Sequence, residues 1–271
     1  GEKFDLAGIT PPTVPDEQNF ALTPIMFGTY GSMSDKTGHE ITPRNTNIVD
    51  RLHLEIFRDK DSVGGTNGLW AKGTLTDLRG WQNYYRTPTN ADGRAITNEF
   101  PTSPQPQSPA QDVLLALSKY DSTLEELRQA SQMPYSRFPM EYDKEDPAAI
   151  LLPHLARLKQ SAMFLQLRAI AELQNEQSDQ AAADTKLACY LIDAPRAEPF
   201  LISHLVRIAM SSFMLQPIYE GLAQHKWSDA QLAALDADLA KFYFLSDYQK
   251  SIRGEAAGTA KMIDYIRHTR K

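Results

Sequence analysis

Cysteine is nearly absent from this sequence, with Cys189 the single example among 271 residues. One cysteine cannot form an intrachain disulfide, and it excludes a zinc site built mainly from thiolates. Its neighbours are Ala188, Tyr190 and Leu191, none of which lowers the pKa of a thiol. We therefore expect a buried, unreactive thiol rather than a catalytic nucleophile.

Charge of one sign is not concentrated in any part of the chain. The net charge is −6, and residues 1–108 and 109–271 contribute −3 each. This balance gives no basic surface for nucleic acid, so no nucleic-acid partner is expected. No run of 18 apolar residues occurs, so we expect no membrane-spanning segment.

The chain begins with glycine rather than methionine, which suggests that an upstream segment was removed. Any association with a membrane is expected only through such a missing N-terminal segment.

Short catalytic motifs are lacking as well. No HExxH or GxSxG sequence occurs, and GGTNG at 64–68 lacks the lysine and the following helix of a phosphate-binding loop. The six histidines are scattered, and none stands four residues from another. The sequence therefore predicts no metal centre, no cofactor and no recognisable catalytic residue.

The best-patterned stretch is 146–195, which predicts two helices joined by a polar turn at 174–179. Apolar residues recur there at steps of three and four, as on one face of a helix. Asp146 is the expected N-cap of the first helix, and Pro153 either kinks that helix or marks its true start. Ser178 is the expected cap of the second helix, whose alanines allow close approach of the two axes.

Helical periodicity continues on both sides of this hairpin, and a glycine at 254 indicates close packing in the last helix. The expected helices cover 108–131 (one helix, or two with a break at Asp121), 198–225 (interrupted by Pro217), 227–242 (capped by Ser228) and 246–269.

Residues 1–108 are rich in proline and glycine and predict a loop-rich arm with short helices. Short helices are expected near Asp16, over 45–57, and over 76–86 with Thr76 as cap, followed by a long loop at 87–109. The predicted fold is all-α. Residues 109–271 form an antiparallel stack or bundle of helix hairpins, and the arm packs on them.

Two family resemblances accompany this fold. The segment RAIAEL…DQAAADTKLACYL…P resembles a tetratricopeptide array, although the period is nearer 50 than 34 residues and the packing glycine is missing. The chain also resembles a family of exported, mostly helical bacterial proteins with no known activity. The matching elements are PPTVPDEQNFA, AKGTLTDLRGWQNYYR, YSRFPMEY, LARLKQSAMFLQLRA, FLISHLVRIA and SIRGEAA. The second resemblance implies a periplasmic or envelope location and no catalytic residue.

Four aromatic side chains in the arm are the first candidate binding residues: Trp70, Trp81, Tyr84 and Tyr85. Their rings could stack on a sugar, a peptide or peptidoglycan. The alternative, which we favour, is that they clamp the arm to the helical body.

The second candidate group is Arg137, His154 and His204. The two histidines stand at matching places near the starts of two long helices, and with Glu141 or Asp146 they could form a polar pocket. The alternative is structural: buried histidines with satisfied hydrogen bonds, and an arginine in a bridge between elements.

Two functions follow from these observations. The first is a non-enzymatic binding or scaffolding protein of the bacterial cell envelope that recognises a protein, peptide or glycan, since stacked helix hairpins commonly present such a surface. The alternative is a hydrolase acting on envelope polymers, with its pocket between the arm and the helices.

Overall fold

Helices form the whole framework of this protein. The structure is a computed structural model, and it describes residues 6–27, 29, 52, 54, 56, 67–87, 99–142, 144 and 146–269. These residues contain no β-strand, only an isolated bridge between Asn19 and Tyr135. The all-α prediction is therefore confirmed. Most of the helix expected over 45–57 and part of the loop expected over 87–109 lie outside the described residues.

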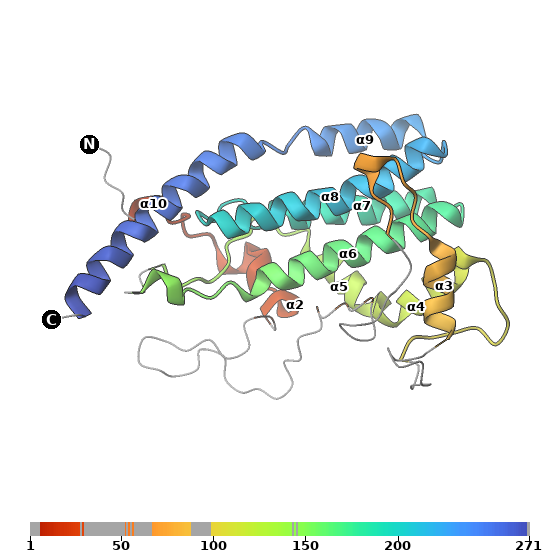
Figure 1. Cartoon of the computed structure of the whole chain (residues 1–271), viewed down its shortest axis with the longest axis horizontal. Helices are drawn as coiled ribbons and strands as arrows, with labels where there is room; N and C mark the ends of the chain where they lie inside the picture. The colour runs from red at the N-terminus through yellow and green to blue at the C-terminus, as the bar shows by residue number, and fades with distance from the viewer. Residues whose placement is uncertain are drawn as a thin grey trace.

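The hairpin of α6 (Pro153–Gln174) and α7 (Ser178–Asp193) lies at the centre (Figure 1). Pro153 is the first residue of α6, so it marks the true start of that helix. The Asp146 side chain caps only a short 3-10 turn, η6 (Pro147–Ala149). The expected Ser178 cap is wrong, because Ser178 is already helical and no side chain caps α7.

A second hairpin packs on the first. α8 (Leu201–Ala223) lies against both α6 and α7, and α9 (Asp229–Leu239) lies against α7. The expected interruption at Pro217 is wrong, since α8 runs through it. Pro217 is buried with its neighbours, and this packing offsets the lost backbone hydrogen bond. The Ser228 cap is confirmed: Ser228 and Gln231 form a capping box.

Three further helices complete the body. The predicted break at Asp121 is confirmed, because α4 (Pro109–Leu117) and α5 (Asp121–Ala130) are separated by the 3-10 turn η5 (Ser118–Tyr120). The last helix, α10 (Phe244–Thr269), packs on α8 and runs past the end of the bundle (Figure 1). On length and composition α8 could cross a membrane, yet half of its apolar window is buried within the fold.

The arm consists of short elements. They are α1 (Leu6–Ile9), η1 (Asp16–Gln18), η2 (Phe20–Leu22), α2 (Pro24–Phe27), η4 (Trp70–Lys72) and α3 (Leu78–Arg86). Asp77 rather than Thr76 caps α3, because the Asp77 carboxylate accepts from the Gly80 amide. Thr76 instead donates to Glu220 on α8, which ties the arm to the body.

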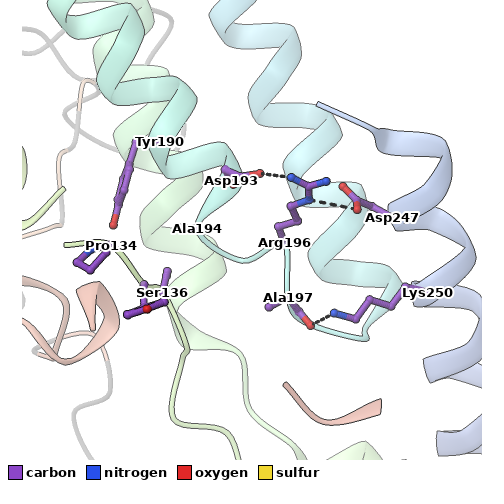
Figure 2. Close-up of a pocket in the computed structure, with 10 residues that line it drawn as sticks. Pro134, Ser136, Tyr190, Asp193, Ala194, Arg196, Ala197, Asp247 and Lys250 are labelled. Carbon is purple, nitrogen blue, oxygen red and sulfur yellow. Dashed lines mark hydrogen bonds and ion pairs between the residues drawn. The ribbon is translucent and has the colours of Figure 1, made fainter. Parts of the chain in front are cut away.

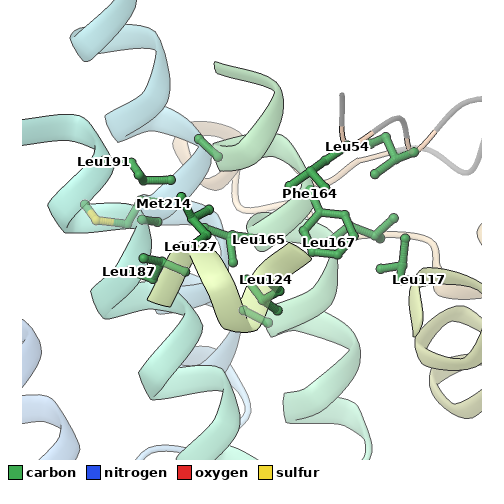
Figure 3. Close-up of a cluster of buried hydrophobic side chains, with 14 of the residues drawn as sticks. Leu54, Leu117, Leu124, Leu127, Phe164, Leu165, Leu167, Leu187, Leu191 and Met214 are labelled. Atoms are coloured by element: carbon green, nitrogen blue, oxygen red, sulfur yellow. The ribbon is translucent and has the colours of Figure 1, made fainter. Parts of the chain in front are cut away.

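Arm and body share one hydrophobic core. Phe20, Trp81 and Tyr85 are fully buried and belong to the same cluster as Leu158 and Leu191 of the central hairpin. Figure 3 shows side chains from the arm and from several helices meeting in this core. The arm is therefore an integral part of the fold.

Candidate functional site

One cavity lies where α7 ends. It has a volume of about 390 Å³ and opens between the 134–136 segment, the connection from α7 to α8, and the start of α10 (Figure 2). α7 ends just before Pro195, and the backbone then turns to reach α8. This turn brings charged side chains from three segments to one place.

Arginines and aspartates form the polar wall. Arg196 Nε lies 3.3 Å from Asp247 Oδ1, and its Nη1 lies 3.7 Å from Asp193 Oδ1. Arg207, almost fully buried in α8, places Nη1 3.0 Å from Asp247 Oδ2 and Nη2 3.5 Å from Asp193 Oδ1. Arg207 Nε also donates to the Ile192 carbonyl. The buried guanidinium therefore holds both carboxylates in position.

Lysine 250 adds a third positive charge. Its Nζ donates to the Ala197 carbonyl (Figure 2). Burial lowers the pKa of Lys250, with Arg196 and Arg207 acting in the same direction and Asp247 opposing them. Burial likewise raises the pKa of Asp193 against the two arginines. The charged residues that line the cavity are two cations, Arg196 and Lys250, and two carboxylates, Asp193 and Asp247, so their formal charges balance.

The remaining wall is suited to organic ligands. Tyr135 is 46% exposed, while the Tyr190 hydroxyl is held by the Met133 carbonyl. The Ser136 hydroxyl makes no hydrogen bond within the described part of the chain. Nowhere among the described residues do three or more potential metal-ligating side chains gather. The arrangement fits an anionic group next to an aromatic surface.

The four arm aromatics lie elsewhere. Trp81 stacks on Tyr85 with ring centroids 5.8 Å apart, and both side chains are fully buried. Tyr84 packs edge-on against both rings and is partly buried. Trp70 is 38% exposed, and its Nε1 donates to Ser212 of α8. This geometry joins the arm to α4 and α8, and Trp70 is the most exposed of the four rings.

His154 belongs to a buried polar cluster at the start of α6. Its Nε2 lies 2.7 Å from Glu198 Oε1, and Glu198 Oε2 accepts the Ser203 hydroxyl. The His154 ring stacks on Phe138 at 4.0 Å. All three polar side chains are at most 5% exposed. The cluster joins α6, α8 and the segment between α7 and α8.

His204 and Arg137 are not in that cluster. The His204 ring contacts Phe244 and Tyr248 of α10, and burial lowers its pKa. Arg137 Nε donates to the Pro11 carbonyl, and its amide donates to Asn19, so it fastens the arm. The structure therefore places Arg137, His154 and His204 in three separate environments.

A second cavity, of about 310 Å³, lies between the arm and the helices. Glu220 at its wall accepts from Thr76 and from Gln216. No histidine or second carboxylate lines it. The hydrolase hypothesis expected a pocket between arm and helices near Arg137, His154 and His204, but none of these three residues lines this cavity, and it lacks an acid–base pair.

The charged wall of the main cavity was not anticipated from the sequence. One signal was present: Arg207 interrupts the apolar run of FLISHLVRIAM, and a charge inside a core helix requires buried partners. Those partners come from segments 14 and 40 residues away, which periodicity alone cannot bring together.

Comparisons with protein-family models, curated proteins and solved structures gave no match. The function of this protein is therefore inferred from its own geometry.

Proposed function

We propose that this protein is a non-enzymatic binding protein that holds a carboxylate-bearing peptide or glycan in the cavity at the end of α7. The observation that carries the proposal is a preformed cavity with two partly exposed cations, Arg196 and Lys250, in its lining and an exposed tyrosine at its edge. Ligand pockets commonly combine such a shape with a few fixed polar groups.

Arg196 and Lys250 are the groups that bind the ligand's carboxylate. Both are only partly buried, so a ligand can reach them, whereas Arg207 is buried and acts by holding the two aspartates. Arginine binds carboxylates through its planar fork, and lysine acts as a point charge. Tyr135 packs against the adjoining part of the ligand.

This arrangement predicts a definite pH dependence. Burial lowers the pKa of Lys250 in the free protein, and a bound carboxylate favours its charged form. Affinity is therefore highest where Lys250 is protonated, and it falls as the pH rises through the lowered pKa.

The test uses short peptides with a free C-terminal carboxylate, the same peptides amidated, and a carboxylated disaccharide. Isothermal titration measures each affinity for the wild type, Lys250→Met, Arg196→Gln and Lys186→Met. Lys186 is exposed on α7 and serves as the matched control. We expect both cavity variants to weaken binding at least about tenfold, roughly one charge-assisted hydrogen bond, and the control to change little. Equal affinity for amidated and free peptides would refute the assignment.

A hydrolase is the second candidate, because His154, Glu198 and Ser203 form a continuous chain of hydrogen bonds. The geometry weakens it: the carboxylate stands between the serine and the histidine, whereas a catalytic histidine must contact the serine directly. Hydrolysis of a peptidoglycan or ester substrate by the wild type, abolished in Ser203→Ala, would support the hydrolase over the binding protein. The envelope location stays a prediction from the resemblance.

A further inference from the structure

The last helix has its apolar side turned away from the protein. Beyond Phe244, which packs on the core at its start, the face of α10 that meets the body is small or polar, and it includes Ser251, Gly254 and Ala257, each close to fully buried. Gly254 is required there because a Cβ would overlap the Pro199 carbonyl oxygen. The confirmed close packing at Gly254 therefore fixes the rotation of the helix, and its apolar face points outward.

That outward face is a continuous stripe. Leu245 is 78% exposed, and four further large apolar residues of the stripe are 41–46% exposed. At 100° per residue the stripe stays within one narrow sector of the helix over roughly 32 Å, at 1.5 Å per residue. Its members are Leu245, Tyr248, Ile252, Ala256, Thr259, Ile263 and Ile266.

The spacing of the stripe is symmetric about the middle of the helix. Positions 245 and 266, 248 and 263, and 252 and 259 are equally distant from the point between residues 255 and 256. In an antiparallel pair of identical helices, Leu245 would therefore meet Ile266 of the partner subunit, and Tyr248 would meet Ile263 of the partner subunit. Such a self-complementary surface is what a two-fold interface requires, because each contact occurs twice. Ala256 at the centre allows the two axes to approach closely.

Along the first half of α10 the exposed apolar surface is wider, because α8 lies beside it. The Leu201 amide donates to Glu255, and the His204 ring contacts Tyr248, so the two helices run antiparallel at this level. Exposed apolar residues on this part of α8 are Ile202, Leu205 and Ile208. The outer end of the partner's α10, which runs past its own bundle (Figure 1), would lie at this level.

The available area fits a weak dimer. One helix about 10 Å wide over about 32 Å, with a second beside half of it, presents a surface on the order of 500 Å². Stable interfaces begin at about 600 Å² per partner, so we expect a dimer in equilibrium with monomer. Apolar surfaces of this size on folded proteins mark interaction sites.

We propose that α10 is the two-fold interface of a homodimer, in which the outward stripes of two copies pack antiparallel. The charged cavity at the end of α7 lies on the inward side of α10 and stays open in this dimer. Dimer formation and ligand binding are therefore independent, and failure of either proposal leaves the other standing.

Sedimentation velocity over a range of concentrations tests the dimer with the full chain. We expect a monomer–dimer equilibrium for the wild type and at least about a hundredfold weaker association for Ile252→Glu/Ile263→Glu. The control is Leu222→Glu, which changes an equally exposed residue at the far end of α8 and should leave association unchanged. Circular dichroism establishes that each variant is folded. A wild type that stays monomeric, or one that binds lipid vesicles only as a monomer, overturns the proposal.

Cysteine cross-linking tests the antiparallel register. Ala256→Cys places two thiols next to the two-fold axis, where a disulfide can form. In Ile266→Cys the two thiols stand about 32 Å apart along the axis, beyond the reach of a disulfide. The native Cys189 is buried and contributes little background. Cross-linking of both variants would indicate a parallel pair and overturn the register, as would cross-linking of Ile266→Cys alone.

Discussion

Two glycines four residues apart in α10 have opposite roles. A Cβ at Gly254 would overlap the Pro199 carbonyl, whereas a Cβ at Gly258 would meet nothing within 4 Å. Overpacking costs about 1–3 kcal/mol, and alanine gains about 1 kcal/mol over glycine inside a helix.

We therefore expect Gly254→Ala to lower the free energy of unfolding by about 2 kcal/mol and Gly258→Ala to raise it by about 0.5–1 kcal/mol. Urea denaturation of both variants against the wild type measures this difference. Since the helix and the substitution are the same, each variant is the control for the other. Equal effects would show that α10 does not approach the 195–200 segment this closely.

The burial of Cys189 agrees with the prediction made from its neighbours in the sequence. Its unreactive character was predicted from neighbours that offer no positive charge. In the structure Cys189 is buried, and this burial raises the pKa of its thiol to about 12, with Asp238 acting in the same direction. A pKa in this range leaves almost no thiolate near neutral pH.

At the scale of elements, a buried ionic network joins three helices. Glu172 of α6 and Asp184 of α7 both lie against Arg168 Nε, at 3.0 and 3.1 Å, and Arg128 of α5 also pairs with Asp184. Burial, followed by the charge of Asp184, raises the pKa of Glu172 to about 8. The folded protein therefore retains a proton on this pair that the unfolded chain releases near its ordinary pKa of 4.5.

The raised pKa of Glu172 makes the free energy of unfolding depend on pH. Between the ordinary pKa of Glu172 and about 8 the folded state binds more protons, so the free energy of unfolding falls as the pH rises. We expect a loss of about 4 kcal/mol between about pH 5 and about pH 8.5, and a much flatter profile for Glu172→Gln. Urea denaturation at several pH values measures both profiles.

Glu17→Gln is the matched control, because Glu17 is exposed in η1, away from this network, and should keep the wild-type slope. A Glu172→Gln profile parallel to that of the wild type would contradict the raised pKa.

Helix periodicity identified the order of the elements, since α4 to α10 each fall within a stretch predicted as helical. Caps were less predictable: Ser228 was correct, Thr76 was wrong because Asp77 caps α3 instead, and Ser178 was wrong because α7 has no side-chain cap. Pro217 was wrong because tertiary burial outweighed a local propensity. The charged cavity depends on contacts between segments 14–54 residues apart, and no local pattern specifies such contacts.

At the scale of the whole molecule, arm and body unfold together. Phe20, Trp81 and Tyr85 from the arm are fully buried in the core of the helices. A fragment of residues 109–271 would expose this part of the core to water, at a cost of roughly 1.5–3 kcal/mol for each large side chain that loses its partners.

We expect the full chain to melt in one transition. The 109–271 fragment should melt at least about 10 °C lower or aggregate, because each kcal/mol of lost stability lowers the melting temperature of a domain this size by about 2–4 °C. Differential scanning calorimetry of both proteins measures the difference. A fragment that melts at the temperature of the full chain would show that the arm is dispensable for stability.

The small and polar inner face of α10 also determines how the molecule opens. Little apolar area holds this helix to the bundle, whereas α6 is buried on almost every side. Amide hydrogens in the outer turns of α10 therefore exchange with solvent through a local opening of that helix, while those of α6 exchange only when the whole protein unfolds. In a dimer the paired stripes would close this low-energy route, so the protection of the last helix would depend on protein concentration.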